Sequence, residues 1–230
     1  SLFQNILSLV SATGNILFII IMTLIFTVIV LIEYYNFKRS IVRFIPNKYF
    51  EIGLRLIYNV EKQVSKYLQG QLLAASTVAI LSILGLLILN KTGANLTLVL
   101  FIGIIAGFAN LIPMIGPFVG MVPAILIAIM NNIGNDVALT HQVFGNIPSP
   151  FFIIDIILMF IVVQQIDNNF VTPLVVGEST GLHPLIVMIS LLIGGIVMGP
   201  MGMLFAVPTA GVVKVIFQEL NFIYQNSHLI

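Results

Sequence analysis

Long, unbroken runs of apolar residues dominate this sequence, with short polar stretches between them. The first strong run covers 20 residues, 16–35, and ends in two tyrosines. As a helix it would reach about 30 Å, which is enough to cross the hydrocarbon core of a bilayer. A second run, 72–89, predicts another span. Because the runs are continuous and do not alternate, they predict membrane helices rather than barrel strands.

The segment between these runs, 36–71, holds seven of the chain's nine lysine and arginine residues. A short loop this rich in basic residues stays in the cytoplasm under the positive-inside rule, so 72–89 should run outward. Apolar positions recur in it at spacings of three and four, from Phe50 to Tyr67, which predicts an amphipathic helix. This helix either rests on the inner leaflet or pairs subunits, and the sequence leaves both open.

Two longer apolar runs, 96–130 and 184–217, are each interrupted by glycine and proline. The first contains Gly116–Pro117 and the second Gly199–Pro200, and a further proline follows each pair (Pro123 and Pro208). Proline removes a backbone donor and clashes with the preceding turn, so both runs are predicted to be helix–break–helix units. Arms of 13 or 14 residues suit re-entrant hairpins better than full spans.

One predicted crossing, 151–166, separates the two broken units, so they should open to opposite sides of the membrane and leave the C-terminus in the cytoplasm. Opposed Gly/Pro-broken units are typical of inverted-repeat transporters, in which backbone groups freed at the breaks bind substrate or ions near the midplane. The alternative is that these residues serve close helix packing, because three GxxxG spacings lie in the same runs.

Five polar residues follow one another closely near the end of the predicted crossing: Gln164, Gln165, Asp167, Asn168 and Asn169. Such side chains cannot face lipid without a partner, so they either line a wet cavity or end in headgroup water. Their spacing places Gln164 beside Asn168 and Gln165 beside Asn169 on a helix.

Asp155 lies near the start of the same crossing, in FFIIDIILMF, with no basic neighbour within a helical turn. An ionisable group inside a membrane span suggests an ion ligand, a proton carrier or a structural polar anchor. Alternatively, Asp155 is only one turn deep and reaches the external interface.

Composition agrees with the membrane interpretation. Hydrophobic residues make up 59% of the 230 residues, charged residues 7%, and the mean hydropathy is +1.14. These values exclude an ordinary soluble domain. The chain has no cysteine, which excludes disulfides and thiolate chemistry within it, and its net charge of +1 argues against nucleic-acid binding. It starts at Ser1 without a methionine, so we expect an N-terminal portion to be missing.

Two features resemble catalytic or metal sites. Residues 177–181 match G-x-S-x-G literally, but that motif requires a strand before the serine and a helix after it, and here it falls in a loop between membrane helices. The three histidines, His141, His183 and His228, share no metal-ligand spacing. We therefore expect no enzyme activity, no metal and no cofactor.

Three stretches resemble the AI-2E family of bacterial transporters: KYLQGQLLAA (66–75), NLIPMIGPFVGMVPAILIAI (110–129) and VVQQIDNNFVTPLVVGESTGLHPLIVMISLLIGGIVMGPMGMLFAVPTAGVVKVI (162–216). The resemblance implies an inner-membrane permease. Some members of this family are described as exporters of the signal autoinducer-2, and others as sodium(lithium)/proton antiporters. The family resemblance does not choose the substrate.

The family pattern matches this chain at both Gly-Pro breaks, at QQIDNN and at the GLHP turn (Gly181, His183, Pro184). There are two departures: Asp167 stands where the family more often has Glu, and Glu178 stands where a basic residue is expected. The candidate substrate or ion pathway consists of Asn110, Pro113, Gly116, Pro117, Asp155, Gln164, Gln165, Asp167, Asn168, Gly199, Pro200 and Gly202.

The sequence thus predicts an all-α, polytopic membrane protein with two re-entrant hairpins of opposite orientation. Its predicted parts are a first span (1–35), a basic cytoplasmic segment (36–71) and a transport core (72–230). The first functional hypothesis is a secondary transporter that exports a small polar metabolite such as autoinducer-2 by alternating access, with Asp155 and Asp167 handling an ion or proton. The alternatives are a sodium(lithium)/proton antiporter and a non-transport membrane assembly protein.

The predicted location is the bacterial inner membrane, and the predicted partners are the lipid bilayer, a small polar solute and, for a coupled transporter, Na⁺ or H⁺. A homo-oligomer is expected, because the GxxxG faces and the amphipathic helix offer more pairing surface than one small subunit needs.

Overall fold

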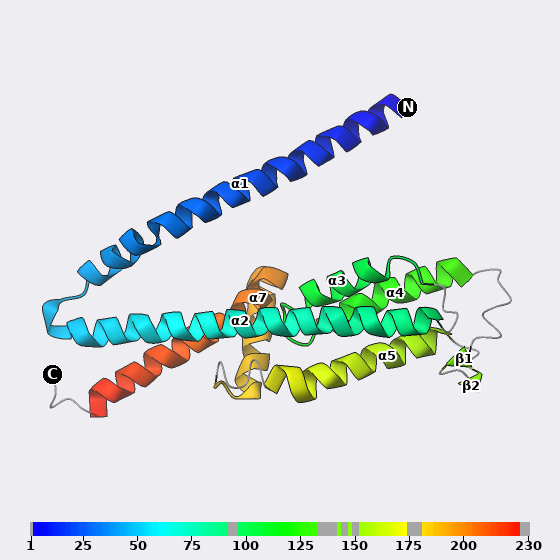
Figure 1. Cartoon of the computed structure of the whole chain (residues 1–230). Helices are drawn as coiled ribbons and strands as arrows, with labels where there is room; N and C mark the ends of the chain where they lie inside the picture. Colours follow the sequence, from blue (N-terminus) through cyan, green and yellow to red (C-terminus); the bar gives the residue numbers. More distant parts are fainter. Residues whose placement is uncertain are drawn as a thin grey trace. The chain divides into compact units, whose positions relative to one another are not determined.

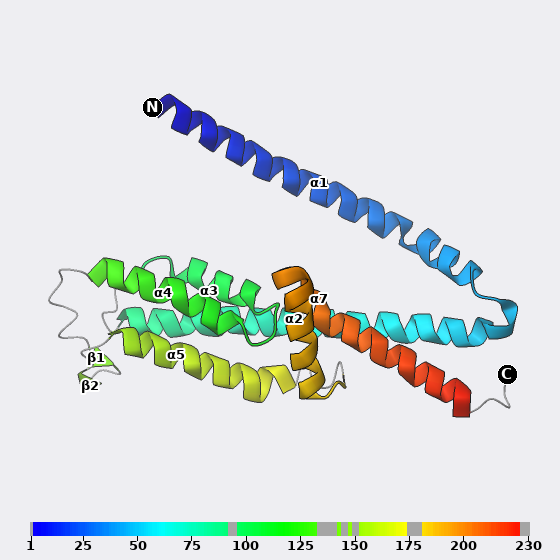
Figure 2. The same ribbon diagram turned by 180° about the vertical axis from the view of Figure 1, so that it is seen from behind.

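The computed structural model describes residues 2–91, 96–132, 142–143, 147–148, 152–173 and 181–225. Figures 1 and 2 show the chain from two sides. The elements in chain order are α1 (Leu2–Arg43), η1 (Asn47–Tyr49), α2 (Phe50–Leu89), α3 (Val99–Ala109), α4 (Gly116–Asn132), β1 (Gln142–Val143), β2 (Ile147–Pro148), α5 (Phe152–Ile166), η4 (Asp167–Val171) and α7 (Pro184–Gln225). The strands β1 and β2 form one short antiparallel pair, and the remaining elements are helical.

Four helical stretches are long and apolar enough to cross a membrane: Gly14–Arg43, Asn47–Leu89, Ile153–Val171 and Pro184–Gln225. Two shorter apolar helices, Val99–Ala109 and Gly116–Asn131, lie between them in the chain. A bilayer core accepts helices because all their backbone groups are bonded internally. The predicted class, a helical membrane protein, is confirmed.

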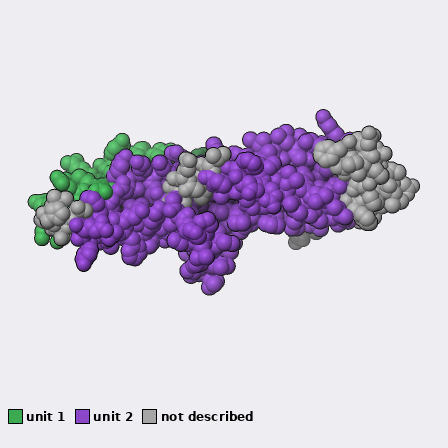
Figure 3. Space-filling model, turned by 90° about the horizontal axis from the view of Figure 1, so that it is seen from below, with its two compact units in different colours: residues 1–55, 226–230 green, residues 56–225 purple. Residues whose placement is uncertain are grey.

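The chain divides into two compact units, coloured separately in Figure 3: unit 1 (residues 1–55 and 226–230) and unit 2 (residues 56–225). Within unit 1, no side chain of α1 from Gly14 onward is buried. The turn after α1 is closed by local packing, since a Cβ on Gly53 would lie 2.6 Å from the Ile45 Cδ1 atom.

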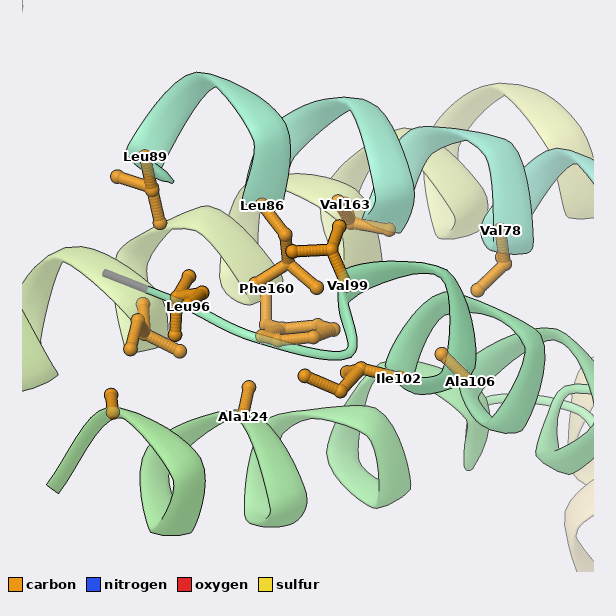
Figure 4. Close-up of a cluster of buried hydrophobic side chains, with 12 residues drawn as sticks. Val78, Leu86, Leu89, Leu96, Val99, Ile102, Ala106, Ala124, Phe160 and Val163 are labelled. Atoms are coloured by element: carbon orange, nitrogen blue, oxygen red, sulfur yellow. The ribbon is translucent and has the colours of Figure 1, made fainter. Parts of the chain in front are cut away.

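The helix α2 is continuous over 40 residues, so the expected amphipathic helix and the span that follows it form one helix. Its sequence explains this continuity, because residues 60–89 contain no proline and only two glycines. The C-terminal half of α2 packs with α3, α4 and α5 around one apolar cluster. Figure 4 shows Leu86, Ile102, Ala106 and Phe160 in this cluster.

The first predicted break lies between α3 and α4, at residues 110–115. Gly116 begins α4, and Pro117 takes the first helical turn, where its missing N–H is not needed. Within the break, Met114 has φ +71°, an uncommon conformation for a residue with a side chain. Pro123 lies inside α4 and does not end it. A helix–break–helix unit is confirmed here.

The second predicted break is a single residue within α7. Gly199 has φ +62° and ψ −143°, a conformation open essentially only to glycine. Pro200 begins the second arm directly after it, in a position like that of Pro117 in the first turn of α4, whereas Pro208 lies inside that arm. Both breaks therefore occur at Gly-Pro pairs, as predicted. Whether the arms are re-entrant stays a prediction.

Candidate functional site

Several buried polar side chains come from three helical elements of unit 2. Gln71 of α2, Asn110 at the end of α3, and Gln164 and Asp167 near the end of α5 are each exposed by 9% or less. Polar groups rarely occupy such positions in a membrane helix without a functional or structural reason. Two of them, Asn110 and Asp167, are 1% exposed and are joined by the contacts described next.

Asp167 opens η4, a π-helical turn at the end of α5. Such turns are rare, and they occur often at functional sites. The side chains of Asn110 and Thr172 lie within reach of the Asp167 carboxylate. Neither closes a hydrogen bond of good geometry, so both carboxylate oxygens are buried without a partner among the described residues. The acid from the polar patch therefore lies directly beside the first Gly-Pro break.

Asn110 connects three parts of this region. Its backbone N–H continues the helical pattern of α3 by donating to the Ala106 carbonyl, at 3.0 Å. Its own carbonyl accepts a hydrogen bond of 2.5 Å from the Nε2 atom of Gln71, on α2. A Cβ on Gly116 would lie 2.8 Å from the Asn110 Oδ1 atom, so glycine at that position lets the amide approach the start of α4. The break is thus fixed to α2 on one side and to α4 on the other.

The buried polar atoms of this region are mainly oxygens that accept hydrogen bonds. Among the described residues, those without a hydrogen-bond partner include Gln71 Oε1, Asn110 Oδ1, Gln164 Oε1 and both oxygens of Asp167. A buried carboxylate is stable only when it is protonated, hydrogen-bonded or neutralised by a cation. Carboxylate and amide oxygens are also the ligands that hard cations prefer. The arrangement can therefore hold either a proton or a cation.

The QQIDNN patch divides between two faces of its helix. The Gln164 Nε2 atom donates to Asn168 Oδ1 at 2.9 Å, and the Asn169 Nδ2 atom donates to Gln165 Oε1 at 3.1 Å. Both predicted pairs are confirmed. Gln164 and Asp167 are buried, whereas Gln165 and Asn169 are exposed. Gln165 therefore does not share the buried surroundings of Asp167.

Asp155 is also buried, at 9% exposure, on the same helix as Asp167. The two residues are 12 positions apart, which corresponds to about 18 Å along the helix. One solute or ion cannot contact both carboxylates at once over that separation. The structure therefore places the two predicted ion-handling acids at separate positions.

The residues of the second break pack within α7 itself. A Cβ on Gly202 would overlap the carbonyl group of Gly194, so the two arms approach each other at backbone distance. The arms also line a cavity of about 470 Å³, with apolar residues such as Ile193 and Phe205 at its surface. No hydrogen bond between the described residues links Gly199, Pro200 or Gly202 to Asp167.

Two polar contacts outside the Asp167 region position α7. The Asn59 Nδ2 atom of α2 donates to Glu219 Oε1 at 2.6 Å, and the Lys214 Nζ atom donates to the Gly181 carbonyl at 2.8 Å. The second contact holds the GLHP turn against the C-terminal arm. In the same turn, the His183 Nδ1 atom accepts a hydrogen bond of 3.3 Å from the Leu185 N–H, at the start of α7.

Gln71 was not predicted to belong to this region, and Tyr67, one turn before it on α2, was predicted only as part of the apolar face of 36–71. Tyr67 is 2% exposed and packs with Val207 of α7. The sequence could have indicated this position of Gln71, because polar residues recur on α2 at a spacing of four and so share one face: Asn59, Gln63, Tyr67 and Gln71.

The first four residues of the G-x-S-x-G match, 177–180, lie outside the described residues, as do His141 and His228. Over the ranges that are described, no three His, Cys, Asp or Glu side chains come together in a way that could hold a metal ion.

Comparisons with known proteins identify the family of this chain. The family model "AI-2E family transporter" matches residues 1–222. The chain is 32% identical to "Putative transport protein YueF" of Bacillus subtilis (strain 168), over 94% of this chain and 54% of that protein. It is 28% identical to "Putative transport protein YrrI" of the same organism, over 90% of this chain and 53% of that protein.

A relative from another bacterium is "Putative transport protein YhhT" of Escherichia coli (strain K12), which is 26% identical over 72% of this chain and 41% of that protein. The chain spans about half the length of the Bacillus relatives. No solved structure matches it. The family model covers nearly the whole chain, both breaks included, and the chain belongs to the AI-2E family of transporters.

Proposed function

We propose that the full-length protein is a secondary transporter of the bacterial inner membrane that exports a small polar metabolite, such as autoinducer-2, by alternating access. The buried contact between Asp167 and Asn110 carries this proposal. It joins the one acid of the QQIDNN patch to the break in the first hairpin, which is where broken-helix transporters bind their substrates.

Two further observations support a transport site at this position. The break contains Met114 at positive φ, and strained backbone of this kind clusters at ligand-binding and switch regions. The neighbouring amides of Gln71 and Gln164 offer oxygens that no described residue engages, so a polar solute could hydrogen-bond to them. In this proposal Asp167, Asn110 and Gln71 contact the solute, and α7 moves against the other helices.

A sodium(lithium)/proton antiporter is the second candidate, and the composition of the same region favours it. Its buried atoms without a partner include five oxygens from one acid and three amides, on Gln71, Asn110, Gln164 and Asp167. An acid that alternately binds a proton and a cation is the minimum that such an exchange requires. The antiporter would use Asp167 as that acid, whereas an exporter need not use it for coupling.

The test is solute flux into proteoliposomes that contain the full-length protein, with autoinducer-2 and sodium measured separately under an imposed pH gradient. We expect Asp167→Asn to lower coupled transport by roughly a factor of ten or more, because the amide keeps the shape but can carry neither charge nor an exchangeable acid proton. Asp155→Asn is the matched control, since it makes the same change on the same helix about 18 Å away.

Each outcome distinguishes the candidates. Autoinducer-2 flux without cation exchange supports the exporter. Sodium–proton exchange that is lost in Asp167→Asn, with no autoinducer-2 flux, supports the antiporter. Equal loss in both variants would place the two acids on one proton relay. The absence of both autoinducer-2 flux and sodium–proton exchange would favour the third hypothesis, a membrane assembly protein.

The proposal extends to topology and assembly. We propose that 36–71 and the C-terminus are cytoplasmic, and that the protein is a homo-oligomer. The seven basic residues of 36–71 support the first point through the positive-inside rule. The exposed apolar surface of α7, which includes Ile196 and Val197, supports the second, because it offers area for contact with another subunit.

A further inference from the structure

We infer that the C-terminal part of α1 is a binding site for one anionic phospholipid of the inner leaflet. The site is a stripe on a single helix, Val28, Ile32, Tyr35, Arg39 and Arg43, and it lies within unit 1. It is independent of the Asp167 region and of the transported solute.

The stripe follows from helical geometry. At 100° per residue, its five members fall within about 80° of one another around the helix axis. All five are exposed, with Val28 at 54%, Ile32 at 70% and Tyr35 at 78%. The face therefore changes along its length from aliphatic to aromatic to cationic side chains. A phospholipid has the same order of chemistry, from acyl chain to glycerol and then phosphate.

The dimensions agree with one leaflet. From Val28 to Arg43 is 15 residues, or about 22 Å of helix. Half of a bilayer, headgroups included, is also about 20–22 Å thick. Tyrosine concentrates at the level where the hydrocarbon meets the headgroups, and Tyr35 stands at that point of the stripe. Next to the stripe, the Lys38 Nζ atom lies 6.0 Å from the centre of the Tyr34 ring, so a second tyrosine and cation meet at this level.

The two arginines are the part of the stripe that needs an anion. Arg39 and Arg43 are four residues apart, so their guanidinium groups are neighbours and repel each other. Neither makes an ion pair or hydrogen bond with another residue that the structure describes. The acid of α1, Glu33, lies about 140° around the helix from Val28 and accepts a hydrogen bond of 3.1 Å from Asn36.

A shared phosphate would remove the repulsion. Guanidinium groups bind phosphate oxygens through paired N–H donors, and two of them one turn apart can hold one phosphate between them. An anionic lipid places its phosphate at this depth, next to acyl chains that cover Val28 and Ile32. Free phosphate would contact the arginines alone, whereas one anionic lipid contacts them through its phosphate and the aliphatic end of the stripe through its acyl chains, which is why the proposed occupant is the lipid.

The test measures which lipids remain bound to the full-length protein. The protein is reconstituted into nanodiscs of phosphatidylglycerol and phosphatidylcholine in equal amounts, and its retained lipids are counted by native mass spectrometry. We expect phosphatidylglycerol to be enriched on the wild-type protein. In the double variant Arg39→Gln, Arg43→Gln, the enrichment of phosphatidylglycerol should be roughly 30-fold lower, since each cation near an anionic surface strengthens binding about fivefold.

A matched control removes two charges elsewhere. Lys62 and Lys66 are also four residues apart and exposed, on α2, so Lys62→Gln, Lys66→Gln lowers the net charge equally. We expect this variant to keep the enrichment. The conservative variant Arg39→Lys, Arg43→Lys should lose part of it, because lysine keeps the charge but not the paired donors.

Several outcomes would overturn the proposal. These are unchanged enrichment in the double arginine variant, equal loss in the Lys62 and Lys66 control, and release of the lipid by excess inorganic phosphate. A cross-link in the bilayer between a cysteine introduced at Ile32 (Ile32→Cys) and another segment of the protein would also overturn it, because that segment would then cover the stripe. All substitutions are on exposed helix surface, so co-elution with the wild-type protein in size-exclusion chromatography verifies that each variant is folded.

Discussion

The two broken hairpins share a Gly-Pro sequence at the start of the second arm but are held in different ways. In the first hairpin, glycines join the two arms and also bring them against other helices. Gly120 meets Ala106 of α3 and Phe160 of α5, and Gly107 meets α2. In the second hairpin, most glycine contacts are between the two arms of α7, where Gly194 faces Gly202 and Gly195 faces Met203. Gly211 meets Gln63 of α2. The first is part of the core, and the second is held mainly by contacts between its own arms.

The difference shows that a break in a helix does not by itself decide what a hairpin can do. Gly107 lies against the backbone of α2 and Gly120 against the Phe160 ring of α5, so α3 and α4 have little room to shift without a change in α2 and α5. The hairpin α7 has much of its surface exposed and meets α2 through a few side chains, among them Glu219 and Tyr67. If one hairpin moves during transport, this comparison favours α7.

The largest expected effect is on the first hairpin. A Cβ on Gly107 would lie 2.6 Å from the Ala79 Cβ atom and 2.9 Å from the Ala75 carbonyl oxygen. Gly107→Leu should therefore force α3 away from α2 and lower the free energy of unfolding by roughly 3 kcal/mol. Thermal unfolding of the purified protein in detergent measures the loss. Gly14→Leu is the control, because nothing lies within 4 Å of that position and leucine favours the helix.

If Gly107→Leu were as stable as the wild-type protein, the contact between α2 and α3 would be loose. The first hairpin would then not be packed more tightly against other helices than α7.

An intermediate effect is expected where the arms of α7 meet. Gly202→Ala would place its Cβ into the backbone of Gly194, so the arms must separate. We expect solute flux into proteoliposomes to fall by about tenfold, in keeping with an overpacking cost of about 1–3 kcal/mol. The apolar cluster around Phe160 should stay folded. Gly195→Ala is the matched control, since its Cβ would meet only the flexible side chain of Met203. Equal flux in the two variants would contradict a close contact between the arms.

The smallest effect is expected at the turn of α7. Gly199 has positive φ, and no atom beyond its immediate chain neighbours and the local helix backbone lies within 4 Å of the position that a Cβ would take, so Gly199→Ala introduces backbone strain and no clash with another part of the structure. Because the residues on both sides of the kink are exposed and the kink can relax, we expect a local cost of about 1 kcal/mol. Hydrogen exchange should become faster in the arms of α7 and stay unchanged in α3 and α4. Faster exchange in both hairpins would show that they are coupled.

Sequence reasoning succeeded where local chemistry decides the structure. The Gly-Pro pairs at Gly116 and Gly199 mark the starts of the second arms, because proline restricts the backbone wherever it occurs. The pairs Gln164–Asn168 and Gln165–Asn169 follow from the helical repeat alone. The continuity of α2 could have been predicted too, since no proline interrupts residues 60–89.

Sequence reasoning failed where the answer depends on which residues meet across the fold. Gln165 and Asp167 are two positions apart and both polar, yet one is exposed and the other buried. Asn110 and Asp167 are 57 residues apart, and Gln71 is 39 residues from Asn110. No spacing rule predicts contacts of that kind, since they depend on how whole helices pack.

The sequence by itself therefore determined that this is a helical membrane protein, where its helices break and which residues could carry charge inside it. Composition and backbone restrictions act within a few residues, so they can be inferred along the chain. Only the tertiary structure decided that Asp167 lies beside Asn110 at the first break, that Asp155 lies elsewhere, and that one hairpin is packed into the core while the other is exposed. Burial and pairing are properties of the packed helices, and packing brings together residues that the chain keeps far apart.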